Sequence, residues 1–216
     1  MIKACIFDLD GTLTNTLHTL AYFVNAETAK YGLPPAPAEA FKYFAGNGAR
    51  TLIQRVLAYH HIDDTKLEDR ILKDYNTAYD ANFLHLCTVY PGIKELITQL
   101  HTKEIKLAVL SNKPQPTTEK VVEAFFGKTV FNVVFGQREG VPIKPNPAGV
   151  FEILQQFHCE KSECLYIGDT AVDMETGNAA GLVTVGVLWG FRERKELEES
   201  HAAYIIESPK GLLSLV

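Results

Sequence analysis

The chain begins with MIKACIFDLDGT, residues 1–12, and this stretch decides the fold. A short apolar run rich in strand-forming residues ends in two carboxylates, Asp8 and Asp10, which Gly11 follows. Glycine lets the backbone turn at this point, so both acids can converge on one place. Crowded carboxylates repel each other unless a cation neutralises them, and oxygen ligands favour a hard ion such as Mg²⁺. Taken alone, however, such a pair more often belongs to a solvated turn.

Length, composition and charge limit the classes of protein. The 216 residues suit one large domain, or a core domain with a smaller insertion, and 46% apolar residues suffice for a packed core. A net charge of −5 provides no basic field for phosphate backbones, so we expect no nucleic-acid partner. No apolar stretch reaches the roughly 20 residues that a bilayer requires, and no signal peptide is evident. We therefore expect a cytoplasmic protein without membrane contact.

The chain shows two patterns of hydrophobic residues. Residues 15–87 have apolar positions spaced by three and four, which is typical of helices. From residue 88 onward, expected strands at 105–110, 130–135, 164–167, 183–187 and 204–206 alternate with helical stretches. Together with the opening strand, this alternation predicts a parallel sheet covered on both faces. We therefore predict an α/β fold, with a discontinuous core of residues 1–14 and 88–216 and an all-helical insertion of residues 15–87 after the first strand.

Chemically active residue types gather at or after the ends of the expected strands. In open parallel α/β sheets, ligands bind beyond the carboxyl ends of the strands. Four such segments read DLD at 8–10, SNK at 111–113, IKP at 143–145 and GDTAVD at 168–173. Each has an ordinary explanation by itself, such as a helix cap or a solvated loop lysine. Their joint occurrence predicts a site of acids, a hydroxyl and a lysine at one edge of the sheet.

In this order, the four segments resemble the motifs of the haloacid dehalogenase-like hydrolase superfamily, over nearly the whole chain. The resemblance implies a Rossmann-like catalytic core with a helical cap inserted after the first motif. Within the superfamily, GNG at 46–48, PG at 91–92 and SNKP at 111–114 look like segments of phosphoglycolate phosphatases. The expected activity is hydrolysis of a small phosphomonoester, with 2-phosphoglycolate the favoured substrate. The expected partner is thus a small phosphorylated metabolite, and the expected assembly is a monomer or a homodimer.

The resemblance and the chemistry of phosphoryl transfer together assign roles to the acids. Asp8 is expected to be the nucleophile that forms an aspartyl-phosphate intermediate. Asp10 is expected to protonate the leaving alcohol and then to deprotonate the hydrolytic water. The expected cofactor is Mg²⁺, held by Asp8, the backbone carbonyl of Asp10 and Asp169, with Asp173 ordering the outer shell.

Other residues are expected to bind the substrate. Ser111 and Lys144 would contact the phosphoryl group, the first as a hydrogen-bond donor and the second as a positive charge, with Asn112 beside them. In the helical insertion, Arg50 is a candidate for a substrate carboxylate because a guanidinium binds carboxylates bidentately. Asn47, at a helix N-terminus, could serve the same end through backbone amides. A solvated helix arginine is the commoner explanation of a residue such as Arg50.

Other functions use parts of the same residue set. A pyrophosphatase or a nucleotide monophosphatase would share the catalytic core, and a phosphomutase would need the same Asp8 and Asp10. A phospho-accepting receiver domain of a signalling protein also combines acids, a hydroxyl and a lysine around a phosphorylatable aspartate. The chain length, the helical insertion and the spacing of the acid pair argue against the receiver domain.

Overall fold

The computed structural model describes residues 1–216 and divides into two compact units. The first, here called the sheet unit, comprises Met1–Asn15 and Val89–Val216, and the second, the helical unit, comprises Thr16–Thr88. The sheet unit is discontinuous because the helical unit is inserted into it. Each boundary of this division lies one residue after the boundary expected from the sequence.

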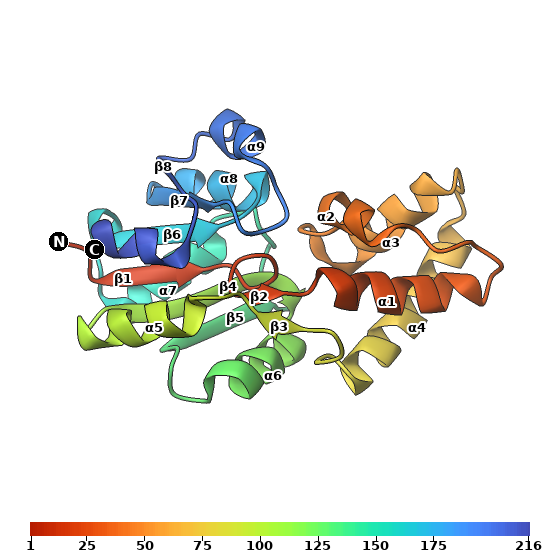
Figure 1. Cartoon of the computed structure of the whole chain (residues 1–216), viewed down its shortest axis with the longest axis horizontal. Coiled ribbons are helices and arrows are strands. Elements are labelled where there is room, and N and C mark those ends of the chain that lie inside the picture. Colours follow the sequence, from red (N-terminus) through yellow and green to blue (C-terminus); the bar gives the residue numbers. More distant parts are fainter. The chain divides into compact units, whose positions relative to one another are not determined.

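A six-stranded parallel sheet with the order β5-β4-β1-β6-β7-β8 forms the centre of the sheet unit. Its strands are β1 (Ala4–Phe7), β4 (Lys106–Pro114), β5 (Val133–Gln137), β6 (Cys164–Gly168), β7 (Val183–Val187) and β8 (Tyr204–Ile206) (Figure 1). The opening strand β1 therefore lies between β4 and β6. The predicted α/β fold with a parallel sheet is confirmed.

Helices cover both faces of this sheet. The helices α5 (Ile93–Thr102) and α6 (Gln115–Phe126) lie on one face, and α7 (Ala148–Phe157) and α8 (Ala171–Ala180) on the other (Figure 1). The chain runs from β1 through β4 to β5 at one edge of the sheet, and then crosses back to β6 on the other side of β1. Because crossovers between parallel strands are right-handed, the helices before and after this reversal lie on opposite faces of the sheet. The short helix α9 (Arg194–Glu199) and the 3-10 helices η2 (Lys161–Glu163) and η3 (Pro209–Ser214) complete the unit.

Successive residues of β1 contribute to the two apolar layers. Ile6 belongs to a buried cluster with Tyr166 of β6 and Ile153 of α7. Phe7 points to the other face, where its ring meets Phe131 edge-on with centroids 6.5 Å apart. A strand buried on both faces needs apolar residues throughout, which explains the uninterrupted apolar run before the first acid.

Two strand boundaries differ from the expected ones. β4 continues to Pro114 instead of ending at residue 110, so SNK at 111–113 lies within the strand. β5 begins at Val133, three residues later than expected. Before it, Asn132 donates its amide N–H to the Leu107 carbonyl at 2.8 Å and accepts the Leu107 amide N–H on Oδ1 at 2.9 Å. Its side chain thus takes the place of a backbone partner, and regular pairing starts only after it.

The helical unit contains α1 (Leu17–Ala29), η1 (Ala38–Ala40), α2 (Phe41–Phe44), α3 (Gly48–Tyr59) and α4 (Thr65–Ala81). Phe41, Ile53 and Ile71 are fully buried within it. The two-residue strands β2 (Thr14–Asn15) and β3 (Thr88–Val89) pair where the chain passes between the units. No helix in the structure combines the length and the apolar character needed to cross a membrane.

We predict that Ile153→Ala lowers the free energy of unfolding by about 2–5 kcal/mol, because it leaves a cavity in the layer between α7 and the sheet. Gln156→Ala, at an exposed position of the same helix, is the matched control and should stay within about 0.5 kcal/mol of the wild type. Urea unfolding followed by circular dichroism measures both. Equal losses in the two variants would contradict the assignment of this layer as core.

Candidate active site

The three central strands bring a polar residue each to one edge of the sheet. β1 is paired in register with both β4 and β6, and the amide N–H of Asp8 donates to the carbonyl of Ile167 at 2.9 Å. Asp8 therefore follows β1 at the edge where Asp169 follows β6 and where Ser111 lies in β4. The strand order alone explains why residues so far apart in the sequence meet there.

The chain turns sharply after Asp10. The carbonyl of Leu9 accepts hydrogen bonds from the amides of Leu13 at 3.0 Å and Thr14 at 2.9 Å. Gly11 has a φ of +97°, and a Cβ at this position would lie 2.2 Å from Oδ2 of Asp169. Both the left-handed backbone and the close approach require glycine.

The ammonium of Lys144 bridges two carboxylates. Its Nζ donates to Oδ1 of Asp8 at 2.6 Å and to Oδ1 of Asp173 at 2.7 Å. Asn112 fixes the backbone of the lysine, since its Nδ2 donates to the Lys144 carbonyl at 3.1 Å and its Oδ1 accepts the Lys144 amide at 2.9 Å. Burial disfavours the ammonium, but Asp173 and Asp8 outweigh this effect and hold the pKa of Lys144 well above its usual range. The lysine is therefore a fixed positive charge beside Asp8.

Hydrogen bonds from two other segments hold Asp169. Thr12 Oγ1 donates to its Oδ1 at 3.0 Å, and the amide of Phe191 donates to its Oδ2 at 2.8 Å. Trp189 Nε1 in turn donates to the carbonyl of Thr12 at 2.9 Å. A Cβ on Gly190 would lie 2.4 Å from the carbonyl oxygen of Gly11, so the loop at 188–192 packs directly on the turn after Asp10.

Asp173 uses both of its oxygens within the protein. Besides accepting from Lys144 on Oδ1, it accepts on Oδ2 from the amide of Thr170 at 3.2 Å and from Thr170 Oγ1 at 2.8 Å. This reciprocal arrangement is the capping box that starts α8. Asp173 therefore orients Lys144 and ties it to the start of a helix.

The buried acids are arranged as a cation site. Asp8, Asp169 and Asp173 each offer a carboxylate oxygen, and the three oxygens lie within 4.8 Å of one another. Burial, followed by the charge of Asp173, raises the pKa of Asp169 to about 7. Burial likewise raises the pKa of Asp8, with Lys144 opposing the shift and Asp173 and Asp169 adding to it. Crowded carboxylates with hard oxygen donors fit a divalent cation, which would remove their mutual repulsion.

Asp10 lies in a different environment from Asp8. Its Oδ2 forms an ion pair with Nζ of Lys113 at 2.8 Å, whereas its Oδ1 is buried without a hydrogen-bond partner. Lys113 comes from β4, where its amide donates to Ser111 Oγ at 3.2 Å. The two acids of the opening motif are thus each paired with a lysine from a different segment.

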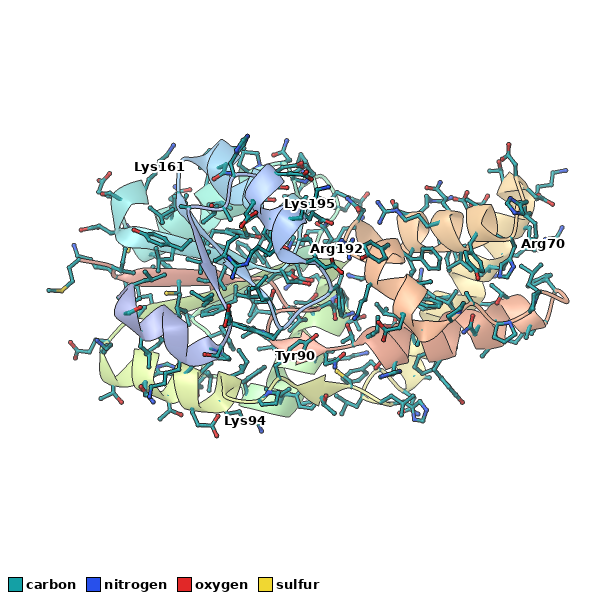
Figure 2. All side chains as sticks on the ribbon, turned by 45° about the horizontal axis from the view of Figure 1, so that its top comes forward. Arg70, Tyr90, Lys94, Lys161, Arg192 and Lys195 are labelled. Carbon is teal, nitrogen blue, oxygen red and sulfur yellow. The ribbon has the colours of Figure 1, made fainter.

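Two further side chains, which are labelled in Figure 2, interact electrostatically with the acids. The guanidinium of Arg192 lowers the pKa of Asp169, against the larger effect of burial. Tyr90 is half-buried, and burial together with the charges of Asp169 and Asp10 raises its pKa. Tyr90 therefore remains a neutral hydroxyl group near the acids.

The candidate residues of the helical unit have partners within that unit. Arg50 Nη1 pairs with the carboxylates of Glu68 and Asp69, the latter at 2.9 Å. Asn47 precedes α3, and its Oδ1 accepts from Arg55 Nη2 at 2.8 Å. Substrate binding by Arg50 or Asn47 stays a prediction.

Some residues of the site were not assigned a role from the sequence. Thr12 and Lys113 stand inside the quoted motifs, and their side-chain partners become visible only in the structure. Trp189 and Phe191 follow β7, and no charged or repeated pattern marks them. Extending the search of strand ends by five residues beyond β7 would have included them.

The comparisons with known proteins agree with this geometry. The model of the haloacid dehalogenase-like hydrolase family matches residues 5–187. The chain therefore belongs to this family, which confirms the resemblance seen in its four motifs. It is thus an enzyme, and the relatives described next confirm its class as a phosphoric monoester hydrolase.

Two relatives are similar over almost their whole length. The chain is 33% identical over 216 residues to the phosphoglycolate phosphatase of Haemophilus influenzae, which covers 97% of this chain and 96% of the relative. It is also 33% identical to the phosphoglycolate phosphatase of Mannheimia succiniciproducens, with the same coverage. The crystal structure of a predicted phosphoglycolate phosphatase from Haemophilus somnus superposes with a TM-score of 0.91 at 26% identity, covering 99% of this chain and 97% of that one.

We predict that Mg²⁺ raises the melting temperature, because a cation on the three acids binds only the folded state. At a concentration about 100 times the dissociation constant, the rise should be about 5–10 °C. Asp169→Asn should abolish this rise, whereas Glu175→Gln, an exposed acid on α8, should preserve it. Differential scanning fluorimetry with and without MgCl₂ makes the measurement. A full rise in Asp169→Asn would contradict the cation site.

Proposed function

We propose that the enzyme hydrolyses a small phosphomonoester, with 2-phosphoglycolate as the favoured substrate, through an aspartyl-phosphate on Asp8. The observation that carries this proposal is the contrast between the two acids of the opening motif. Asp8 is buried and fixed by Lys144 beside the other acids, while Asp10 keeps one carboxylate oxygen without a partner. The relatives named phosphoglycolate phosphatase support the choice of substrate.

In the first step, a carboxylate oxygen of Asp8 attacks phosphorus and the bond between phosphorus and the ester oxygen breaks. Lys144 binds Oδ1 of Asp8, so we assign the attack to Oδ2. Asp10 gives its proton to the departing alkoxide oxygen, and we assign this transfer to the unpartnered Oδ1. Ser111 and Lys144 bind the phosphoryl oxygens and stabilise the charge on the group being transferred.

In the second step, water attacks phosphorus and the bond between phosphorus and Asp8 breaks. Asp10, deprotonated by the first step, takes a proton from this water. The products are inorganic phosphate and the free Asp8 carboxylate, so the enzyme returns to its starting state. This acid–base help is typically worth about 10²–10⁴-fold in rate.

Asp8, Asp169 and the backbone carbonyl of Asp10 would hold Mg²⁺, with Asp173 acting through Lys144 and the outer shell. When bound, Mg²⁺ supplies positive charge that neutralises the acids and the phosphate. The chain has a net charge of −5, so an anionic substrate depends on this local positive charge and on Lys144.

The substrate is tested with a panel of phosphomonoesters and pyrophosphate, assayed by phosphate release with Mg²⁺ and with EDTA. We expect 2-phosphoglycolate to have the highest kcat/KM and EDTA to abolish the activity. A wide preference for pyrophosphate or for a nucleotide would contradict the proposed substrate while keeping the catalytic core. Sugar-phosphate interconversion without net phosphate release would indicate a phosphomutase instead.

We predict that Asp8→Asn and Asp10→Asn fail at different steps. Asp8→Asn should lose at least about 10³-fold in kcat, because the nucleophile is gone. Asp10→Asn should still form the phosphoenzyme from p-nitrophenyl phosphate, whose leaving group needs no proton, but should hydrolyse it slowly.

Mass spectrometry of the acid-quenched protein detects the phosphoenzyme. It should accumulate in Asp10→Asn and be absent from Asp8→Asn. Asp63→Asn, an exposed acid of the helical unit, serves as the control and should behave as the wild type. Full turnover by Asp8→Asn would rule out the covalent route.

A further inference from the structure

Lys113 has no part in the steps described above, although its ammonium lies at the site. Its side chain is only 6% exposed, and its Nζ lies 2.8 Å from Oδ2 of Asp10. An ammonium so far out of water is costly unless an anion accompanies it. Asp10 is this anion in the structure, so Lys113 keeps a positive charge beside the acid that serves the leaving group.

We propose that Lys113 is the specificity-determining residue of the enzyme and binds a carboxylate on the leaving group of the substrate. The inference rests on the proposed function, in which Asp10 serves the ester oxygen of the substrate. In 2-phosphoglycolate a single methylene group separates this oxygen from the carboxylate. A cation hydrogen-bonded to Asp10 therefore lies within reach of that carboxylate.

The distribution of charge at the site supports this role. Four carboxylates surround the reacting groups, and Lys144 is already committed to two of them. Once Asp10 has given up its proton, its carboxylate would repel a leaving group that carries its own negative charge, unless a second cation accompanied both. Lys113 is the lysine on the Asp10 side. A leaving group without charge has no anion to offer this lysine.

The backbone of Lys113 is held firmly enough for recognition. The residue lies where the pairing of β4 with β5 is irregular, between Leu110 and Pro114, but its amide donates to Ser111 Oγ at 3.2 Å and its carbonyl accepts from Thr118 Oγ1 at 3.1 Å. These two hydrogen bonds take the place of strand pairing and fix the backbone from which the lysine side chain extends.

The test compares 2-phosphoglycolate with ethyl phosphate, in which a methyl group replaces the carboxylate. The wild type should prefer 2-phosphoglycolate in kcat/KM. Lys113→Met should lose about 10–100-fold more in kcat/KM on 2-phosphoglycolate than on ethyl phosphate, the effect of one charge-assisted hydrogen bond, since the loss of the pair with Asp10 affects both esters. Lys113→Arg should recover part of the loss. Lys94→Met, an exposed lysine of α5 labelled in Figure 2, is the matched control and should change neither value.

Several outcomes would overturn the inference. If Lys113→Met lost kcat/KM equally on both esters, the lysine would have a structural role. If the wild type had the same kcat/KM on both esters, the enzyme would be a phosphatase that does not recognise the carboxylate. A wild type that hydrolyses neither ester would remove the proposed function and this inference with it.

If the variants do not fold, inhibition of the wild type by glycolate tests the carboxylate site. Glycolate should inhibit the hydrolysis of ethyl phosphate at concentrations where ethylene glycol, its neutral counterpart, does not. Equal inhibition by the two compounds would contradict a carboxylate site.

Discussion

The bridge from Lys144 to Asp8 and Asp173 is the contact on which the rest of the site depends. It joins the end of β1, the connection between β5 and α7, and the first turn of α8 through one ammonium. Three buried acids packed this closely would destabilise the fold without compensating charge. The lysine supplies one positive charge, and a divalent cation would supply the remaining two. Asn112 then fixes the lysine backbone, so neighbouring motifs position one another's side chains.

The two lysines divide the site into two halves with different electrostatics. Lys144 pairs with Asp8, where the proposed mechanism transfers the phosphoryl group, and Lys113 pairs with Asp10, where it releases the leaving group. Phosphoryl transfer depends mainly on positioning and on charge stabilisation. Separate cations allow the first half to remain common to the family while the second half adapts to the leaving group. Substrate choice could then change through a residue beside the acid rather than through the nucleophile.

The sequence predicted the parallel sheet and the gathering of Asp8, Ser111, Lys144 and Asp169, because the carboxyl ends of parallel strands meet at one edge. It could not predict the partner of Lys113 or the packing of the loop at 188–192 on Gly11, because both depend on side-chain directions rather than on spacing. The predicted start of β5 at residue 130 was also wrong, because the side-chain amide of Asn132 takes the place of a backbone hydrogen-bond partner before Val133. Strand propensity and hydrophobic periodicity do not indicate where a side chain replaces a backbone hydrogen-bond partner.

The order of the site residues along the chain has a consequence for biosynthesis. Asp8 leaves the ribosome before the helical unit, whereas Lys144 lies 136 positions later and the Thr12 partner Asp169 lies 157 positions after that threonine. Contacts of such long sequence separation form late, because a large loop must close before they stabilise anything. The central strand β1 therefore stays unpaired on the β6 side until Cys164–Gly168 has been made. The internal contacts of the helical unit lie within 73 consecutive residues, Thr16–Thr88, so this unit can fold before β1 pairs with β6.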